Sequence, residues 1–183
     1  VPEGQQRPAE FLKINPRGNV PVLVDDGHAM REGGAIISYL LDKHNSPMLP
    51  KSGPARANAL EWLMFANATM HPAYGRLFFI KRVMAEGEEK TKAFAAAVEA
   101  VNRLWADVDA QLANQPYICG EQCSAADILL SVIANWGKGG THGGVAENVV
   151  LGTNVQRMLK AVSTRDSFAK ALEKESVHYN AVA

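Results

Sequence analysis

The segment from Asn15 to Val24 reads Asn-Pro-Arg-Gly-Asn-Val-Pro-Val-Leu-Val, and it constrains the fold more than any other part of this chain. Its apolar end predicts a β-strand over residues 20–25, which begins at the Val20–Pro21 bond. A proline at the start of a strand donates no hydrogen bond to a neighbouring strand. We therefore expect the Val20–Pro21 bond to be cis, which leaves the backbone of Val20 free to pair with another group.

The first 44 residues have the pattern of a small α/β unit. Asp26-Gly27 is a hairpin signal, so that residues 28–30 are expected to return as a second strand. Residues 33–43 predict a helix with apolar side chains on one face, at Ile36, Ile37, Leu40 and Leu41. We expect residues 8–15 to be a connecting segment that allows a short helical turn.

The rest of the chain has the composition of a helical domain. Pro47, Pro50 and Pro54 punctuate residues 45–54 and predict a linker. The first helix is expected over residues 55–86, with a kink near His71 because Pro72 removes a backbone hydrogen bond. Further helices are predicted over residues 90–112, 124–136, 154–163 and 166–174. The glycine-rich stretch over residues 137–144, which includes His142, is expected to be a flexible loop because it lacks the order of a phosphate loop.

Charge and cysteine content argue against several classes of protein. The 19 Lys and Arg residues balance 19 Asp and Glu residues, so the sequence does not indicate the basic face of a nucleic-acid or anionic-membrane binder. No run of 18 apolar residues predicts a transmembrane helix. Cys119 and Cys123 are too few for a disulfide framework, and their spacing matches no usual zinc or redox motif. We expect packed thiols, no metal and a cytoplasmic protein.

Ser124 and Asp127 have the spacing of a capping box. The Ser124 side chain is expected to cap the following helix, and the Asp127 carboxylate to reach back to the backbone N–H of Ser124. This motif predicts a structural role, namely the start of the buried helix over residues 124–136.

Four segments together resemble a bacterial glutathione transferase of the beta class. They are Phe11 to Pro21, Arg31 to Leu40, Glu61-Trp62-Leu63 with His71 further along that helix, and Tyr117 to Gly120 followed by Ser124 to Ile128. The first and fourth segments are specific to the superfamily, and the Glu32-Gly33 pair and His71 point to the beta class. The resemblance covers nearly the whole chain.

This resemblance implies both a fold and an activity. The fold is a thioredoxin-like α/β glutathione-binding domain, present in part over residues 1–44, then a linker over 45–54 and an all-α domain over 55–183. The activity is that of a transferase that conjugates the glutathione thiolate to small hydrophobic electrophiles, or reduces them with it, in bacterial detoxification. A homodimer is expected from the family and from Trp62, Phe65 and Phe79 on the long helix.

The resemblance also assigns a glutathione site. The backbone of Val20, beside Pro21, is expected to hold the cysteinyl part of the tripeptide. Glu32 is expected to pair with the γ-glutamyl ammonium, and the backbone of Gly33, at a helix N-terminus, with its carboxylate. Many family members have Ser where this chain has Gly33.

His71 is the candidate catalytic residue within this sequence. In the beta class a histidine here approaches the sulfur, and the alternative is an ordinary helix histidine beside the Pro72 kink. The family often has Asn at the position of Met64 and Lys at that of Pro72, so both readings of His71 stay open.

The resemblance further implies a strand–helix–strand unit of about 30 residues or more before residue 10. We expect that unit, together with the main thiol-activating residue, to lie outside this sequence. A non-catalytic glutathione-transferase-like module for protein interaction or ligand binding therefore stands as the alternative to an enzyme.

Overall fold

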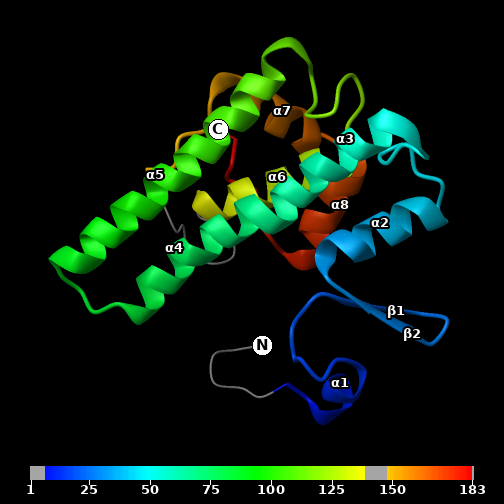
Figure 1. Ribbon diagram of the computed structural model, residues 1–183, viewed down its shortest axis with the longest axis horizontal. Helices are drawn as coiled ribbons and strands as arrows, with labels where there is room; N and C mark the ends of the chain where they lie inside the picture. The colour runs from blue at the N-terminus through cyan, green and yellow to red at the C-terminus, as the bar shows by residue number, and fades with distance from the viewer. Residues whose placement is uncertain (1–6, 139–147, 183) are drawn as a thin grey trace. The chain divides into compact units, whose positions relative to one another are not determined.

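The computed structural model describes residues 7–138 and 148–182, and the chain divides into two compact units, Val1–Pro47 and Met48–Ala183 (Figure 1). The first unit contains helices on either side of a β-hairpin. The described part of the second unit is helical apart from an isolated bridge between Tyr117 and Gly120. The predicted fold class, an α/β unit followed by an all-α domain, is confirmed.

The first unit follows the predicted order of elements. Its elements are helix α1 (Ala9–Ile14), strands β1 (Val22–Asp25) and β2 (His28–Arg31), and helix α2 (Gly33–Lys43). The strands are antiparallel, with Val22 opposite Arg31 and Asp25 opposite His28. Asp26 and Gly27 both have positive φ, of 47° and 77°, as a two-residue type I′ turn requires. The first strand begins at Val22 and not at Val20, since Pro21 has no N–H to donate to the ladder.

Asp25 connects the hairpin to α2. Its Oδ2 atom accepts hydrogen bonds from the Tyr39 hydroxyl, at 2.6 Å, and from the Lys43 ammonium. The hydrogen bonds from Lys43 and Tyr39 lower the pKa of the Asp25 carboxyl. These bonds fix one end of the hairpin against the exposed side of the helix.

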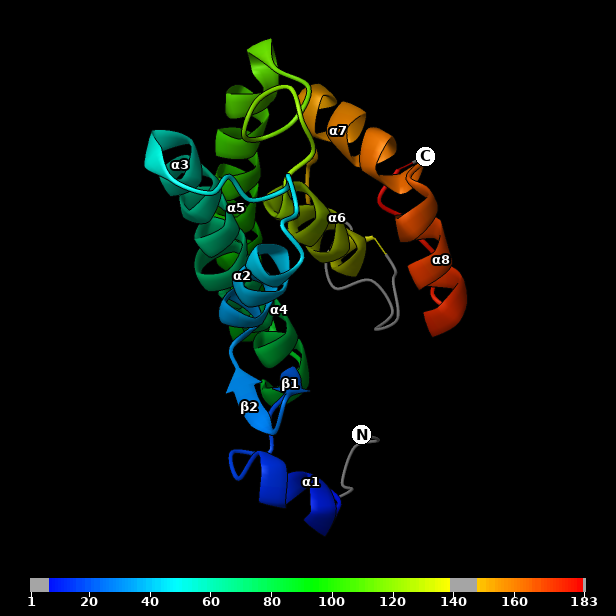
Figure 2. The same ribbon diagram turned by 90° about the vertical axis from the view of Figure 1, so that its right-hand side faces the viewer.

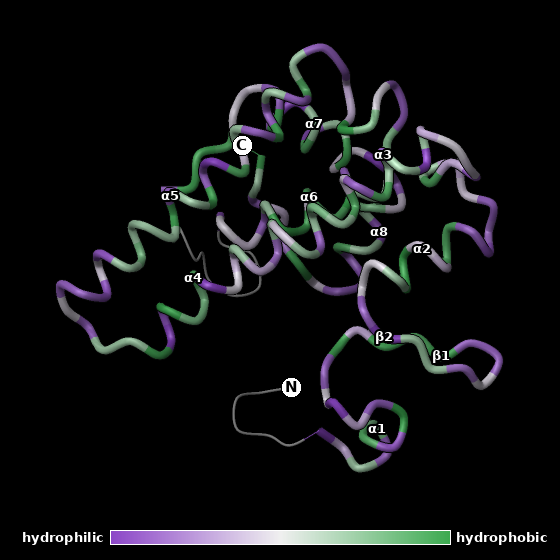
Figure 3. Tube along the Cα trace, viewed as in Figure 1, coloured by the Kyte–Doolittle hydropathy of each residue, from purple (hydrophilic) through white to green (hydrophobic). Residues whose placement is uncertain are grey.

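The second unit is built around a central helix. Its elements, in order, are α3 (Gly53–Met64), η1 (Phe65–Met70), α4 (His71–Val83), α5 (Glu88–Gln111), η2 (Leu112–Asn114), α6 (Ala125–Gly137), α7 (Thr153–Ser163) and α8 (Asp166–Glu175). Helix α6 contacts α3, η1, α4 and α7. Figure 2 shows α6 between the α4–α5 pair and the α7–α8 pair. Figure 3 shows hydrophobic residues along α6, whereas the first turn of α5 is hydrophilic.

None of the helices in residues 7–138 and 148–182 combines the length and the apolar character that a membrane span requires. The longest, α5, buries one stripe consisting of Val98, Val101, Trp105, Val108 and, just beyond its end, Leu112. Phe94, one turn before Val98, is partly exposed.

The helix predicted over residues 55–86 is interrupted before Pro72, in a form that the sequence did not predict. A π-helical segment, η1, separates α3 from α4, and α4 begins at His71. Pro72 cannot donate a hydrogen bond to the preceding turn, and a π-helical turn is one way to rearrange the backbone bonds there. Helix α4 ends at Val83, three residues earlier than predicted, and the next residue, Met84, is extended.

The predicted capping box at the start of α6 is confirmed. The Asp127 carboxylate accepts hydrogen bonds from the backbone N–H of Ser124, at 2.8 Å, and from its hydroxyl, at 2.6 Å. It also accepts the backbone N–H of Ile118, at 2.7 Å, so it fixes the preceding loop as well. Burial raises the pKa of the Asp127 carboxyl, and the hydrogen bonds from Ser124 and Ile118 partly offset that rise.

Helix α7 is capped by a side chain from another helix. Its N-cap residue, Gly152, has no side chain, and Oδ1 of Asp109 in α5 accepts the N–H of Val155 at 2.9 Å. The Asn154 amide donates to the carboxylate and the backbone carbonyl of the same Asp109, at 3.2 Å in both cases. A Cβ atom on Gly152 would lie 2.3 Å from the Asp109 carboxylate, so only glycine leaves room for this cap.

We predict that Gly152→Ala lowers the free energy of unfolding by about 1–3 kcal/mol, because the added methyl group displaces the Asp109 carboxylate. Urea denaturation followed by circular dichroism measures the change. Gly75→Ala in α4 is the matched control, since a Cβ atom at Gly75 meets nothing within 4 Å. That change should stabilise the protein by about 0.5–1 kcal/mol, as alanine in an exposed helix does. Equal effects of the two substitutions would contradict the proposed role of Gly152.

Candidate functional site

The loop before β1 has the backbone form that the sequence predicted. The Val20–Pro21 bond is cis. Val20 is 62% exposed although its side chain is apolar, and Pro21 is exposed as well. Both residues therefore lie at the surface of the first unit.

The junction of β2 and α2 has unusual backbone geometry. Glu32 is the N-cap residue of α2 and has a φ of 72°, a left-handed value that is uncommon for a residue with a side chain. Non-glycine residues in this region concentrate at functional sites. The helix then begins with Gly33, which is partly exposed and has no side chain, and continues with Gly34, which is buried.

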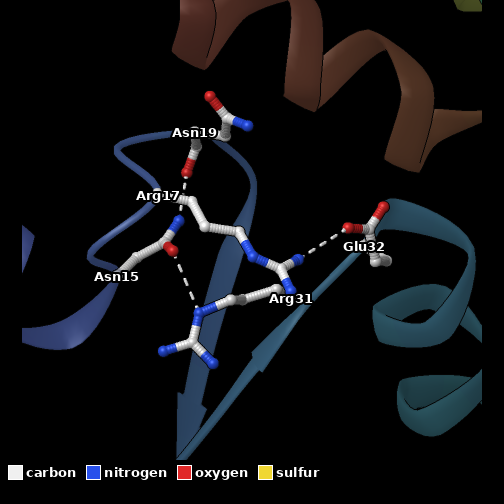
Figure 4. A network of polar contacts seen from close by, with 5 residues as sticks. All are labelled: Asn15, Arg17, Asn19, Arg31 and Glu32. Atoms are coloured by element: carbon white, nitrogen blue, oxygen red, sulfur yellow. Dashed lines mark hydrogen bonds and ion pairs between the residues drawn. The ribbon is translucent and has the colours of Figure 1, made fainter.

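The Glu32 carboxylate is exposed and faces a guanidinium group. Figure 4 shows Arg17 extending toward Glu32, with Nη1 3.4 Å from Oε1. Both side chains are mostly exposed, at 69% and 74%, so the pair contributes little to stability. A carboxylate that is loosely paired on the surface can exchange its partner for a cation of a ligand.

A buried amide links this junction to the loop before Val20. The Asn15 side chain donates to the Asn19 carbonyl at 2.6 Å and accepts Nε–H of Arg31 at 3.0 Å (Figure 4). Arg31 also donates from Nη2 to the Ile14 carbonyl, at 2.5 Å. Val20 follows Asn19, and Glu32 follows Arg31. The hydrogen-bond network therefore extends to both predicted glutathione-binding positions in this unit, Val20 and Glu32.

This arrangement suits a zwitterionic ligand with an adjacent ammonium and carboxylate. The free N–H groups at the start of α2 and the helix dipole favour an anion at Gly33. The neighbouring Glu32 favours a cation. Val20, an exposed residue of the same unit, has a backbone N–H and carbonyl that could pair with a peptide-like part of such a ligand.

His71, the candidate catalytic residue, belongs to the second unit and lies where η1 meets α4. Its ring centroid is 5.0 Å from that of Trp136, and Trp136 also contacts Tyr74 and Phe78 edge-on. His71 as a whole is exposed, and partial desolvation of its ring lowers its pKa below the ordinary value. The imidazole is therefore neutral near pH 7, the form that can accept a proton.

The sequence indicated no role for Trp136, Asn15 or Arg31. Trp136 ends a helix that the hydrophobic pattern assigned to the core, and its ring contact with His71 spans more than sixty positions in the chain. Asn15 lies in the segment from Phe11 to Pro21, and Arg31 begins the segment from Arg31 to Leu40. Nothing in their spacing indicates that their side chains bond to each other.

The two cysteines are packed thiols, as predicted. Both are free, and Cys123 is buried while Cys119 is partly exposed. Burial raises the pKa of Cys123 to about 11 and also raises the pKa of Cys119, so neither is a thiolate near pH 7. Within the described ranges, no group of three or more His, Cys, Asp or Glu residues could hold a metal ion. Residues 139–144 of the predicted glycine-rich loop, with His142, lie outside the described residues.

Two family models match the chain. Residues 1–48 match the model "Glutathione S-transferase, N-terminal domain", and residues 58–139 match "Glutathione S-transferase, C-terminal domain". Glutathione S-transferase GST-4.5 from Xanthomonas campestris pv. campestris is 31% identical over 129 residues, which cover 69% of this chain and 63% of that protein. Glutathione S-transferase D7 from Drosophila melanogaster is 33% identical over 132 residues, 70% of this chain and 56% of that protein. The chain therefore spans less than two thirds of the length of these relatives.

Solved structures with the same fold include bacterial enzymes. BphK, a bacterial glutathione S-transferase solved as a ternary complex, is 30% identical to this chain with a TM-score of 0.75. The match covers 91% of this chain and 79% of the BphK chain. A sphingomonad glutathione S-transferase complexed with glutathione is 29% identical, with a TM-score of 0.73 and coverage of 91% and 78%. A beta-class glutathione S-transferase from Sphingomonas chungbukensis is 26% identical, with a TM-score of 0.71 and coverage of 90% and 78%.

We predict that NMR titration gives His71 a pKa below 6.5, the ordinary value of the imidazole. The folded state then favours the neutral ring, so this contribution to stability is lost as the pH falls below about 6.5. Trp136→Leu should raise the pKa toward 6.5 because it hydrates the ring, whereas the control Trp62→Leu should leave it unchanged. A His71 pKa at or above 6.5 in the parent would contradict this account.

Proposed function

Because the chain belongs to the glutathione S-transferase family, we propose that the intact protein binds glutathione and transfers its thiolate to small hydrophobic electrophiles, or reduces them with it. The main observation behind the proposal is the β2–α2 junction, where exposed Glu32 lies beside the helix N-terminus at the partly exposed Gly33. The glutathione in the related sphingomonad structure supports the same ligand class. In this proposal the chain contributes part of a thioredoxin-like glutathione-binding domain over residues 1–44, a linker over 45–54 and a helical domain over 55–183.

Each part of glutathione has a proposed partner in the first unit. The Glu32 carboxylate takes the γ-glutamyl ammonium, and the backbone N–H of Gly33 takes the adjacent carboxylate. The backbone N–H and carbonyl of Val20, held by the cis bond to Pro21, pair with the cysteinyl backbone. Because Gly33 has no hydroxyl group, the carboxylate depends on backbone N–H groups and the helix dipole alone at this position.

The chemistry requires a thiolate, since the thiol is a poor nucleophile. The S–H proton passes to a base, the sulfur forms a bond to the electrophilic carbon, and a halide or other leaving group departs with its electron pair. His71 is neutral near pH 7 and is the residue of this chain that we propose near the sulfur. It either accepts the proton or donates a hydrogen bond that stabilises the thiolate. No metal takes part in this proposal.

The proposed setting is a cytoplasmic homodimer in detoxification, in a bacterial cell. Apolar surface on the helices of the second unit supports self-association. Phe79 in α4 is 56% exposed, and the rings of Trp62 and Phe65 pack edge-on with centroids 5.2 Å apart. Surface of this kind is typical of protein interfaces.

We predict that the intact protein sediments as a dimer at micromolar concentration. Phe79→Arg should shift the equilibrium toward the monomer, because it places a charge within an apolar interface. Arg103→Glu, a charge change on the exposed side of α5, is the control and should leave the sedimentation coefficient unchanged. A parent that sediments only as a monomer would contradict the proposed homodimer.

We predict that Glu32→Ala weakens glutathione binding by about 1.5–3 kcal/mol, the strength of a charge-assisted hydrogen bond. His71→Ala should weaken binding less and act mainly on the turnover rate or on the pKa of the bound thiol. Calorimetric titration with glutathione and turnover of a model aryl halide measure the two effects. Glu32→Gln keeps an oxygen acceptor without the charge and should give an intermediate affinity. Parent-like binding by Glu32→Ala would show that the γ-glutamyl group binds elsewhere.

A further inference from the structure

Asn15 is a buried polar residue whose backbone and side-chain amide both form hydrogen bonds. It is 1% exposed. Its backbone N–H donates to the Phe11 carbonyl at 2.8 Å and ends α1, while its backbone carbonyl accepts the N–H of Gly18 at 2.9 Å. Its side-chain amide bonds to Asn19 and Arg31. Asn15 therefore stabilises the tight turn over residues 15–18 with both its backbone and its side chain.

The two side-chain bonds of Asn15 lead to two different segments. The amide nitrogen holds the Asn19 carbonyl, which belongs to the peptide bond that precedes Val20. The amide oxygen holds Arg31, whose backbone precedes Glu32. An amide is suited to this task because it offers a donor and an acceptor on one rigid plane. A carboxylate in the same place loses the bond to the Asn19 carbonyl, and an apolar group loses both bonds.

The positions of Val20 and Glu32 relative to each other depend on this link, since each lies on an exposed and irregular segment. The turn over residues 15–18 needs a positive φ at Gly18, which is 69°, and Glu32 has its own left-handed conformation. The Arg7 side chain adds one more bond to the turn, from Nε to the Gly18 carbonyl at 2.8 Å. Arg31 bonds to the Ile14 carbonyl in addition to Asn15 and so holds the end of β2 against the end of α1.

We propose that Asn15 and Arg31 are positioning residues that hold the backbone of Val20 and the junction at Glu32 at the spacing required for one glutathione molecule. The inference rests on the proposed function, because it assigns these two segments to the same tripeptide. Neither side chain touches the ligand. The pair acts by reducing the reorganisation that binding would otherwise require.

Two substitutions test the Asn15–Asn19 and Asn15–Arg31 hydrogen bonds separately. Asn15→Asp keeps an acceptor for Arg31 and adds a charge-assisted bond to it, but it sets a carboxylate oxygen against the Asn19 carbonyl. Arg31→Gln leaves the Asn15–Asn19 bond in place and removes the bonds from the guanidinium group. Tyr39→Phe is the matched control, since it removes a hydrogen bond to Asp25 in the same unit, away from Asn15.

The experiment measures steady-state kinetics of the intact protein with glutathione and a model aryl halide, together with calorimetric titration of glutathione and thermal unfolding. For both Asn15→Asp and Arg31→Gln we expect the KM and Kd for glutathione to rise about tenfold, roughly the loss of one hydrogen bond. The KM for the aryl halide and kcat at saturating glutathione should stay within about twofold, because the reacting atoms keep their partners. Tyr39→Phe should lower Tm and leave the KM for glutathione unchanged.

A purely structural role would appear differently. Lower Tm and lower kcat in both variants, with the KM and Kd for glutathione of the parent, would overturn the inference while leaving the proposed function intact. If Asn15→Asp fails to fold, Arg31→Gln decides the question by the same criteria. A parent that does not bind glutathione at all would overturn the proposed function and this inference with it.

Discussion

The buried carboxylate of Asp127 is the constraint on which the helical unit depends. It accepts two hydrogen bonds from Ser124 and one from the backbone of Ile118, and so fixes both the start of α6 and the loop before it. Because α6 contacts α3, η1, α4 and α7, its start also sets where its far end lies. That far end carries Trp136, whose ring lies against His71. The helix that starts at this cap therefore also carries the ring that contacts the candidate catalytic histidine.

A short polar side chain connects the elements of the first unit in a comparable way. Asn15 joins the end of α1, the loop before Val20 and the end of β2, which a small hairpin could not hold by apolar packing alone. In the second unit Asp109 acts similarly on the start of α7. In each case one buried or partly buried side chain satisfies backbone groups that come from another segment.

The features predicted from the sequence are those whose cause is local. Asp26-Gly27 predicted the hairpin because a type I′ turn needs residues that tolerate positive φ, and Ser124 with Asp127 predicted the capping box from a spacing of three. The cis bond at Pro21 followed from the position of a proline at the start of a strand. The bond between Asn15 and Arg31 and the cap from Asp109 to α7 were not predicted, because they join residues 16 and 46 positions apart and leave no periodic signal. The π-helical form of η1 was missed because Pro72 indicates an interruption but not which hydrogen-bonding pattern replaces the helix.

An NMR titration of the backbone amides of the intact protein with glutathione tests the proposed glutathione site directly. We expect the amide signals of Val20 and Gly33 both to shift and to saturate together, because one tripeptide contacts both. Cysteinylglycine, which lacks the γ-glutamyl group, should shift Val20 and leave Gly33 largely unchanged. Saturation with glutathione that moves neither signal would contradict the proposed site, and so would equal shifts of Gly33 with both ligands.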